Sequence, residues 1–186
     1  MSSRAETHDT RSEGTIAATV SSTRLRGVAR AADYHRSEDE QNATEVSARV
    51  TYEPKAIVFA CNWCSYAGAD LAGVSRMQYP TNIRIVRTMC SGRFDPAFVL
   101  RAFEKGIDGV LILGCHPGDC HYIEGNLEAE KKVTTTRRLL EALGLDSRRL
   151  RLEWVSASEG ARFANLIKEF TENLRNLGPT PLKGGK

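Results

Sequence analysis

The sequence lacks any long hydrophobic segment and carries little excess charge. None of its 186 residues belongs to a run approaching the ~20 consecutive apolar residues that cross a bilayer. No apolar segment follows the charged start, as it does in a secretory signal peptide. The formal net charge of +3 is too small to indicate a nucleic-acid-binding surface. We therefore expect a cytoplasmic protein with no membrane span and no nucleic-acid partner.

Common catalytic and nucleotide-binding motifs are also absent. The sequence contains neither G-x-G-x-x-G after a strand nor G-x-x-x-x-G-K-[ST], the loops that bind nucleotide phosphates. It has no serine-centred nucleophile elbow. Two of its four histidines, His8 and His35, precede the segment with regular periodicity. These absences weigh against an enzyme that is catalytic on its own.

Composition divides the chain into three parts. Residues 1–54 are rich in Ser, Thr, Arg, Glu and Ala in no clear period, with seven basic and nine acidic side chains. They have little to bury, and we expect them to form a disordered N-terminal extension. Residues 55–178 form the predicted domain, and 179–186 a loose tail.

Within the domain, apolar runs alternate with helical patterns. Strands are expected at 56–60, 82–87, 109–113 and 150–155, and helices at 65–76, 95–106, 123–143 and 156–177. Asp95 is the expected N-cap of the second helix, and Ser156 and Glu159 form a capping-box pattern for the last. Strands separated by helices imply right-handed crossovers and a parallel sheet. We predict an α/β fold, flavodoxin-like or Rossmann-like, with a four-stranded parallel sheet of order 2-1-3-4 and helices on both faces.

All five cysteines lie in three stretches that follow predicted strands. Cys61 and Cys64 follow the first, Cys90 the second, and Cys115 and Cys120 the third. The carboxyl ends of parallel strands meet at one edge of a sheet, where such folds build their sites. Four thiolates suffice for an iron–sulfur cluster or a zinc ion. The sequence therefore predicts a thiolate metal centre with one thiol to spare, and it does not say which.

The residues between these thiols suit such a centre. C-x-x-C at a helix start places thiolates near free N–H groups and the positive end of the helix dipole. Gly114 and Gly118 allow backbone N–H groups to approach sulfur closely. Arg87 and Arg93 are candidates to offset the charge of the thiolates.

Other nearby side chains rank below the cysteines. His116 and His121 are possible metal ligands, although loop histidines are more often simply exposed. Asp119 is expected to cap its loop rather than carry protons. Aromatic residues near the thiols are expected to pack or to contact a partner rather than to shield the centre; these are Trp63, Tyr66 and Tyr122.

Three segments, CNWCSYAGADLAG (61–73), RTMCSGRFDP (87–96) and LILGCHPGDCHYIEGN (111–126), resemble a known family. It is the iron–sulfur delta subunit of methyl-viologen-reducing hydrogenase, and the resemblance covers about residues 55–177. It implies a [2Fe–2S] cluster with Cys61, Cys64, Cys90, Cys115 and Cys120 as the ligand set, four of them binding directly. It also implies electron transfer between a hydrogenase or formate dehydrogenase and the flavin-containing A subunit of a heterodisulfide-reductase-like complex.

Two other functions are consistent with the thiols. In a zinc-stabilised interaction module the same thiolates would bind a metal without redox chemistry, and the role would be assembly. In a thiol–disulfide oxidoreductase, Cys61 and Cys64 would form the reactive pair at the helix start. Such an enzyme would not need three further thiols on neighbouring strand ends.

Overall fold

The computed structural model describes residues 52–184, which belong to one compact unit. The predicted N-terminal extension lies outside the described residues except for its last three. Of these, Glu53 pairs with Arg175 at 3.1 Å. The domain boundaries therefore remain predictions.

Four parallel strands form the sheet: β1 (Ala56–Cys61), β2 (Ile83–Thr88), β3 (Gly109–Gly114) and β4 (Leu150–Trp154). Their order is β2-β1-β3-β4, as predicted. Ala60 pairs with Arg87 of β2 and with Leu113 of β3, so these three strands end nearly level. This register brings the segments after β1, β2 and β3 to one edge of the sheet.

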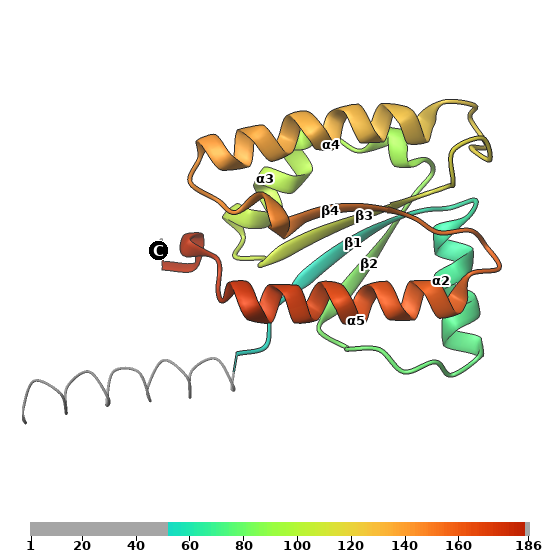
Figure 1. Ribbon diagram of the computed structural model, residues 1–186, viewed down its shortest axis with the longest axis horizontal. Helices are drawn as coiled ribbons and strands as arrows, with labels where there is room; N and C mark the ends of the chain where they lie inside the picture. Colours follow the sequence, from blue (N-terminus) through green and yellow to red (C-terminus); the bar gives the residue numbers. More distant parts are fainter. Residues whose placement is uncertain (1–51, 185–186) are drawn as a thin grey trace, which may run out of the picture. The chain divides into compact units, whose positions relative to one another are not determined.

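Helices cover both faces of the sheet (Figure 1). α2 (Ser65–Val74) and α5 (Gly160–Leu177) lie on one face, and α3 (Pro96–Glu104) and α4 (Gly125–Ala142) on the other. Short 3-10 turns occur at η1 (Ser91–Arg93), η2 (Ser147–Arg149) and η3 (Pro181–Gly184). The predicted α/β fold class is thus confirmed.

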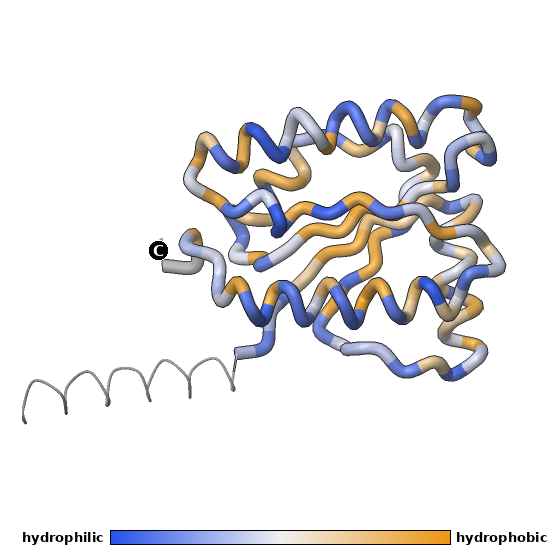
Figure 2. The backbone as a smooth tube through the Cα atoms, in the orientation of Figure 1, coloured by the Kyte–Doolittle hydropathy of each residue, from blue (hydrophilic) through white to orange (hydrophobic). Residues whose placement is uncertain are grey.

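Two apolar cores lie on the two sides of the sheet. One packs Leu111 and Leu113 against Phe163 and Phe170 of α5. The other packs Val110 and Ile112 against residues of α3 and α4. All six residues of β3 are buried, because β3 is central and covered on both faces. In Figure 2 the two central strands, β1 and β3, are mostly hydrophobic, whereas hydrophobic and hydrophilic residues alternate along α4 and α5.

Some helix bounds differ from those predicted. Asp95 caps α3 as expected, with Oδ1 accepting from Ala97 N–H at 2.8 Å. The last helix begins at Gly160 rather than after Ser156, although Glu159 does accept from Ser156 N–H at 2.7 Å. The bond forms half of the predicted capping box, ahead of the helix proper.

No helix among residues 52–184 is both long enough and apolar enough to span a membrane.

Candidate metal centre

The sheet delivers the cysteines to its carboxyl edge. Cys61 is the last residue of β1, Cys115 directly follows β3, and Cys90 lies two residues beyond β2. Cys64 occupies the N-cap position of α2, and Cys120 lies in the loop before α4. Cys120 is partly exposed and the other four are buried. The strand ends thus place all three cysteine segments at the predicted edge.

Three sulfur atoms form a compact group. Cys61, Cys64 and Cys115 have their Sγ atoms within 4.8 Å of one another. Cys115 Sγ lies 3.7 Å from Cys61 Sγ and 2.7 Å from Cys64 Sγ. These residues come from the end of β1, the start of α2 and the segment after β3, so it is tertiary structure that makes the group. We call it the sulfur triad.

The triad has dimensions suited to a shared metal. Thiolates binding one tetrahedral ion at ~2.3 Å have sulfur atoms ~3.8 Å apart. The 3.7 Å between Cys61 and Cys115 matches this spacing, whereas Cys64 would move by about 1 Å away from Cys115. The donor set, all thiols, is the one used by iron–sulfur clusters and structural zinc. The residues present therefore fit such a group.

Cys90 and Cys120 form a second pair beside the triad, and Gly125 brings them together. A Cβ added at Gly125 would clash with Cys90 Sγ and lie 3.3 Å from Cys120 Sγ. Cys90 also interacts electrostatically with Cys61. Gly125, the first residue of α4, must therefore be small. It lies between the loop that carries Cys120 and the segment after β2 that carries Cys90.

Backbone N–H groups converge on the sulfur atoms. Those of Trp63 and Ser91 hydrogen-bond Cys61, and that of His121 hydrogen-bonds Cys115. Gly92 N–H donates to Cys90 Sγ at 3.4 Å. Each of these bonds favours a thiolate over a thiol. The loops thus direct fixed partial positive charge at the sulfur atoms, which would favour thiolate ligands.

The thiols differ in acidity. The hydrogen bond from Cys64 lowers the pKa of Cys61 to about 5, and the same bond raises the pKa of Cys64. Burial raises the pKa of Cys115 to about 11 and also raises the pKa of Cys90. One thiolate, on Cys61, is thus stabilised before any metal binds, whereas Cys64, Cys90 and Cys115 would release protons on becoming ligands.

Two buried polar side chains hold the cysteine loops in place, and sequence reasoning missed both. Ser65 Oγ accepts from Cys61 N–H at 2.9 Å and donates to Leu113 C=O at 2.8 Å. Asn126 Nδ2 donates to the carbonyls of Cys115 and His116 at 3.2 and 2.9 Å. In the sequence, Ser65 directly follows the C-x-x-C motif and Asn126 directly follows Gly125, and these positions are the signals that could identify the two residues.

The two loop histidines have different surroundings. His116 Nε2 lies 2.7 Å from Glu159 Oε2, so Glu159 serves both this histidine and the predicted cap. His121 stacks on Trp63 with ring centroids 3.8 Å apart, and Tyr122 packs edge-on against both rings. Trp63 and Tyr122 are about half exposed. Neither histidine belongs to the sulfur triad.

The remaining predicted side chains lie around the rim. Arg87 lies over the Tyr66 ring at 5.2 Å. Arg93 lines a hollow of about 640 Å³ that also includes Met89, Cys90 and Tyr122. Asp119 and Gly118 lie on an exposed turn, where Gly118 has a positive φ of 92°. The role of the two arginines in offsetting charge stays a prediction.

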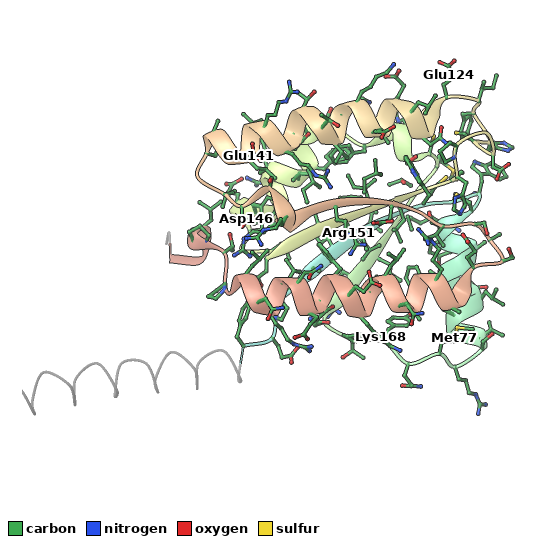
Figure 3. The ribbon with its side chains drawn as sticks, in the orientation of Figure 1. Met77, Glu124, Glu141, Asp146, Arg151 and Lys168 are labelled. Carbon is green, nitrogen blue, oxygen red and sulfur yellow. The ribbon has the colours of Figure 1, made fainter. Side chains whose placement is uncertain are left out.

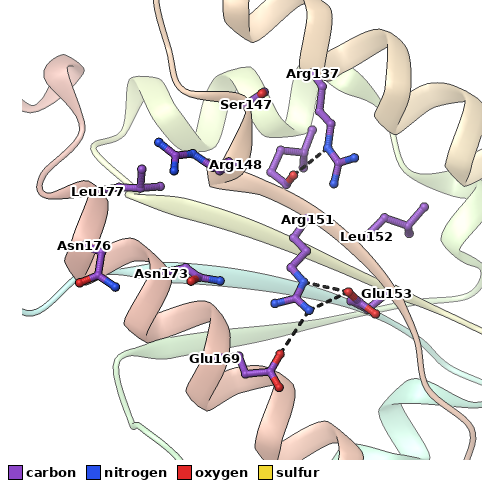
Figure 4. Close-up of a pocket in the computed structure, with 11 residues that line it drawn as sticks. Arg137, Ser147, Arg148, Arg151, Leu152, Glu153, Glu169, Asn173, Asn176 and Leu177 are labelled. Atoms are coloured by element: carbon purple, nitrogen blue, oxygen red, sulfur yellow. Dashed lines mark hydrogen bonds and ion pairs between the residues drawn. The ribbon is translucent and has the colours of Figure 1, made fainter.

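A larger groove lies away from the thiols. It measures about 830 Å³ and follows β4 between α4 and α5, where Arg151 pairs with Glu153 and Glu169 (Figure 4). No cysteine lines it. Figure 3 shows Glu124 at the end of α4 near the cysteine loops and Asp146 beyond the opposite end. The thiol edge is therefore the stronger candidate site.

A parallel α/β sheet with five cysteines at its carboxyl edge defines an α/β domain that carries a candidate thiolate metal site. A family model, methyl-viologen-reducing hydrogenase, delta subunit, matches residues 56–178. The chain belongs to this family.

Individual relatives agree with that family. One is the iron-sulfur subunit of the vhc F420-non-reducing hydrogenase of Methanococcus voltae, 51% identical over 132 residues, which cover 71% of this chain and 92% of the relative. Another is the iron-sulfur subunit of the F420-non-reducing hydrogenase of Archaeoglobus profundus, 48% identical over 128 residues, 69% of this chain and 93% of the relative.

A longer relative contains a similar stretch. The A subunit of the ferredoxin:CoB-CoM heterodisulfide reductase of Methanosarcina mazei is 50% identical over 145 residues, which cover 76% of this chain. The match spans 18% of that relative's own length. The relatives are thus subunits of hydrogenase and heterodisulfide reductase complexes, and two of these three carry iron–sulfur names.

Proposed function

We propose that this protein is a one-electron relay that holds a [2Fe–2S] cluster at the thiol edge of its sheet. The observation that carries the proposal is the convergence of five cysteines, with three sulfur atoms within 4.8 Å of one another. The named iron–sulfur relatives support it. A [2Fe–2S] cluster bound there would supply one-electron transfer.

The chain's own groups would hold and insulate the cluster. The triad of Cys61, Cys64 and Cys115 supplies three ligands, and Cys90 or Cys120 supplies the fourth. Backbone N–H groups pointing at the sulfurs stabilise the negative charge of the thiolates. Burial of Cys61, Cys64, Cys90 and Cys115 excludes water from most of the site.

We further propose that the partners are a flavin-containing heterodisulfide-reductase-like A subunit and a hydrogenase or formate dehydrogenase. The match within the longer Methanosarcina mazei relative supports the first, because a similar stretch is there joined to the rest of a heterodisulfide reductase chain. Exposed apolar side chains near the thiols suit contact with a partner; Trp63, Met89, Tyr122 and Ile123 are between 45% and 83% exposed. The protein would serve a larger oxidoreductase complex as its electron-transfer subunit, without being catalytic alone.

A cytoplasmic location is part of the proposal. Cys61, Cys64, Cys90, Cys115 and Cys120 are all free thiols in the structure. A reducing compartment keeps such clustered thiols available for a metal.

The test is anaerobic purification of the full chain, followed by visible and electron paramagnetic resonance spectra. Iron, acid-labile sulfide and zinc are measured on the same sample. We expect about two irons and two sulfides per chain and a resonance signal that appears on reduction. Zinc without sulfide, together with failed reconstitution by iron and sulfide, would contradict the relay.

A zinc-stabilised interaction module is the second candidate. The compact triad favours it, because a group of this size suits a single ion. Colourless protein with one equivalent of zinc would support it. The thiol–disulfide alternative draws on the low pKa of Cys61, but Cys115 Sγ lies 2.7 Å from Cys64 and would compete for that thiol.

A further inference from the structure

Ser91 has a buried hydroxyl group with no hydrogen-bond partner. The residue is 3% exposed, and its Oγ makes no hydrogen bond to any other group of residues 52–184. A buried hydroxyl without a partner carries a desolvation penalty that folded proteins generally avoid. Ser91 therefore has an unused donor in a place where unused donors are costly.

The position of Ser91 places this hydroxyl at the metal centre. Ser91 directly follows Cys90, and its backbone N–H hydrogen-bonds Cys61. Its Oγ lies 2.8 Å from where a Cβ of Gly114 would be, and Gly114 directly precedes Cys115. The hydroxyl thus lies among three cysteine-bearing segments, while making no hydrogen bond to any cysteine sulfur of the described chain.

Two other buried hydroxyl groups show what is particular to Ser91. Ser65, next to Cys64, uses its hydroxyl group in two hydrogen bonds: it accepts from Cys61 N–H and donates to Leu113 C=O. Thr171 on α5 is also buried, with no partner for its Oγ1 in the described chain, but its neighbours along the helix, Phe170 and Leu174, belong to an apolar core without thiols. Ser91 alone of the three combines an unused hydroxyl with a place beside the thiols.

We propose that the Ser91 hydroxyl donates a hydrogen bond to a sulfur atom of the bound iron–sulfur cluster and thereby raises its reduction potential. Hydrogen bonds to the sulfurs of a cluster are one of the means by which proteins set its potential. Reduction adds negative charge, so a donor stabilises the reduced state more than the oxidised state. The inference rests on the proposed function and makes Ser91 a tuning residue, not a ligand.

The test compares wild type, Ser91→Ala and Thr171→Val as full-length chains reconstituted anaerobically with iron and sulfide. Midpoint potentials are measured by redox titration followed by electron paramagnetic resonance. Resonance Raman spectra are recorded in H₂O and D₂O, because a hydroxyl bonded to sulfur shifts the iron–sulfur bands when it exchanges. Unfolding of each chain without metal is measured by urea titration.

We expect Ser91→Ala to bind iron and sulfide as wild type does but to have a lower potential. A tenfold change in the one-electron equilibrium constant corresponds to about 59 mV, and we expect a shift of that order. The variant should also lose part of the deuterium shift. Thr171→Val should change neither, and neither substitution should destabilise the chain without metal, because each removes only a hydroxyl that lacks a partner.

The outcomes separate this inference from the proposed function. An unchanged potential and deuterium shift in Ser91→Ala, with full loading, would overturn the role of Ser91 and leave the relay intact. That result would mean that the hydroxyl bonds ordered water instead. If the wild-type chain binds no cluster after reconstitution, the proposed function fails first and Ser91 has no cluster to tune. A lower potential in both variants would also contradict a specific role.

Discussion

Cys61 Sγ and Cys115 Sγ lie 3.7 Å apart although the residues are 54 positions apart in the chain. The parallel pairing of β1 with β3 produces this contact, because Ala60 pairs with Leu113 and both strands then end. The packing that holds β1 and β3 together therefore also holds these two sulfur atoms together. Substitutions at this edge should therefore change metal loading, stability or both.

Cys90→Ser should abolish or strongly destabilise the metal centre. Cys90 is the buried member of the second thiol pair, and its serine replacement is a poorer ligand for iron. The visible spectrum and iron content of the reconstituted variant provide the measurement. A spectrum equal to that of wild type would remove Cys90 from the ligand set and assign the fourth position to Cys120.

Gly125→Ala should reduce both loading and stability. The added methyl group meets Cys90 Sγ and Cys120 Sγ, and overpacking of this kind costs about 1–3 kcal/mol. Gly73→Ala is the matched control, because nothing lies within 4 Å of its added Cβ in α2. It should stabilise the chain by about 0.5–1 kcal/mol. Urea unfolding and iron content test the pair, and equal behaviour of the two variants would refute the packing argument.

Asn126→Ala should destabilise the chain by about 2 kcal/mol, because the carbonyls of Cys115 and His116 lose their buried donor. The loop after β3, which carries Cys115 and Cys120, should also become more accessible to proteolysis. Asn165→Ala, at an exposed position of α5, should change stability little. Denaturant unfolding of the two variants decides the point, and a loss of stability equal in both would contradict it.

Metal binding should release protons. Near pH 7 the Cys61 thiol, with a pKa of about 5, is already a thiolate, whereas Cys64, Cys90 and Cys115 have raised pKa values and are protonated. Binding of cobalt(II) to the metal-free chain should therefore release about two to three protons. Affinity should rise with pH between about 6 and 8. Titration calorimetry in buffers of different ionisation enthalpy measures the number, and pH-independent binding would contradict these acidities.

Glu159→Gln should destabilise the metal-free chain at neutral pH and not in strong acid. Ser156 N–H and then His116 lower the pKa of Glu159 from 4.5 to about 2. A carboxyl group whose pKa is lower in the folded state adds stability above its unfolded pKa. That stability is lost as pH falls from about 4.5 to about 2. Glu130→Gln, on the exposed side of α4, is the control.

The difference in unfolding free energy between wild type and Glu159→Gln should therefore shrink across this pH window. A difference that stays constant from neutral pH to strong acid would show that the contacts of Glu159 do not depend on its charge.

Much of the fold follows from periodicity. The alternation of apolar runs and helical patterns predicts four parallel strands, because a helix between two strands returns the chain to the edge where the next parallel strand starts. The predicted order, 2-1-3-4, is also the order in the structure. Asp95 is predictable as a helix cap because the cap depends only on residues next to it in the chain: its carboxylate accepts from Ala97 N–H, and proline follows at the first helical position. The capping-box pattern places the start of the last helix after Ser156, whereas α5 begins at Gly160. Glu159 contacts His116 as well as Ser156 N–H, and His116 is distant in sequence.

Strand ends and cysteine spacing alone predict that the segments with Cys61, Cys90 and Cys115 meet, since parallel strands share their carboxyl edge. The chain pattern does not reveal that Cys120 faces Cys90 across Gly125, that Ser65 and Asn126 hold the loops, or that the Ser91 hydroxyl lacks a partner. These relationships depend on how α4 packs over the segment after β2 and on the paths of the loops. Such contacts join residues far apart in sequence, so they form only when both cores of the sheet are in place.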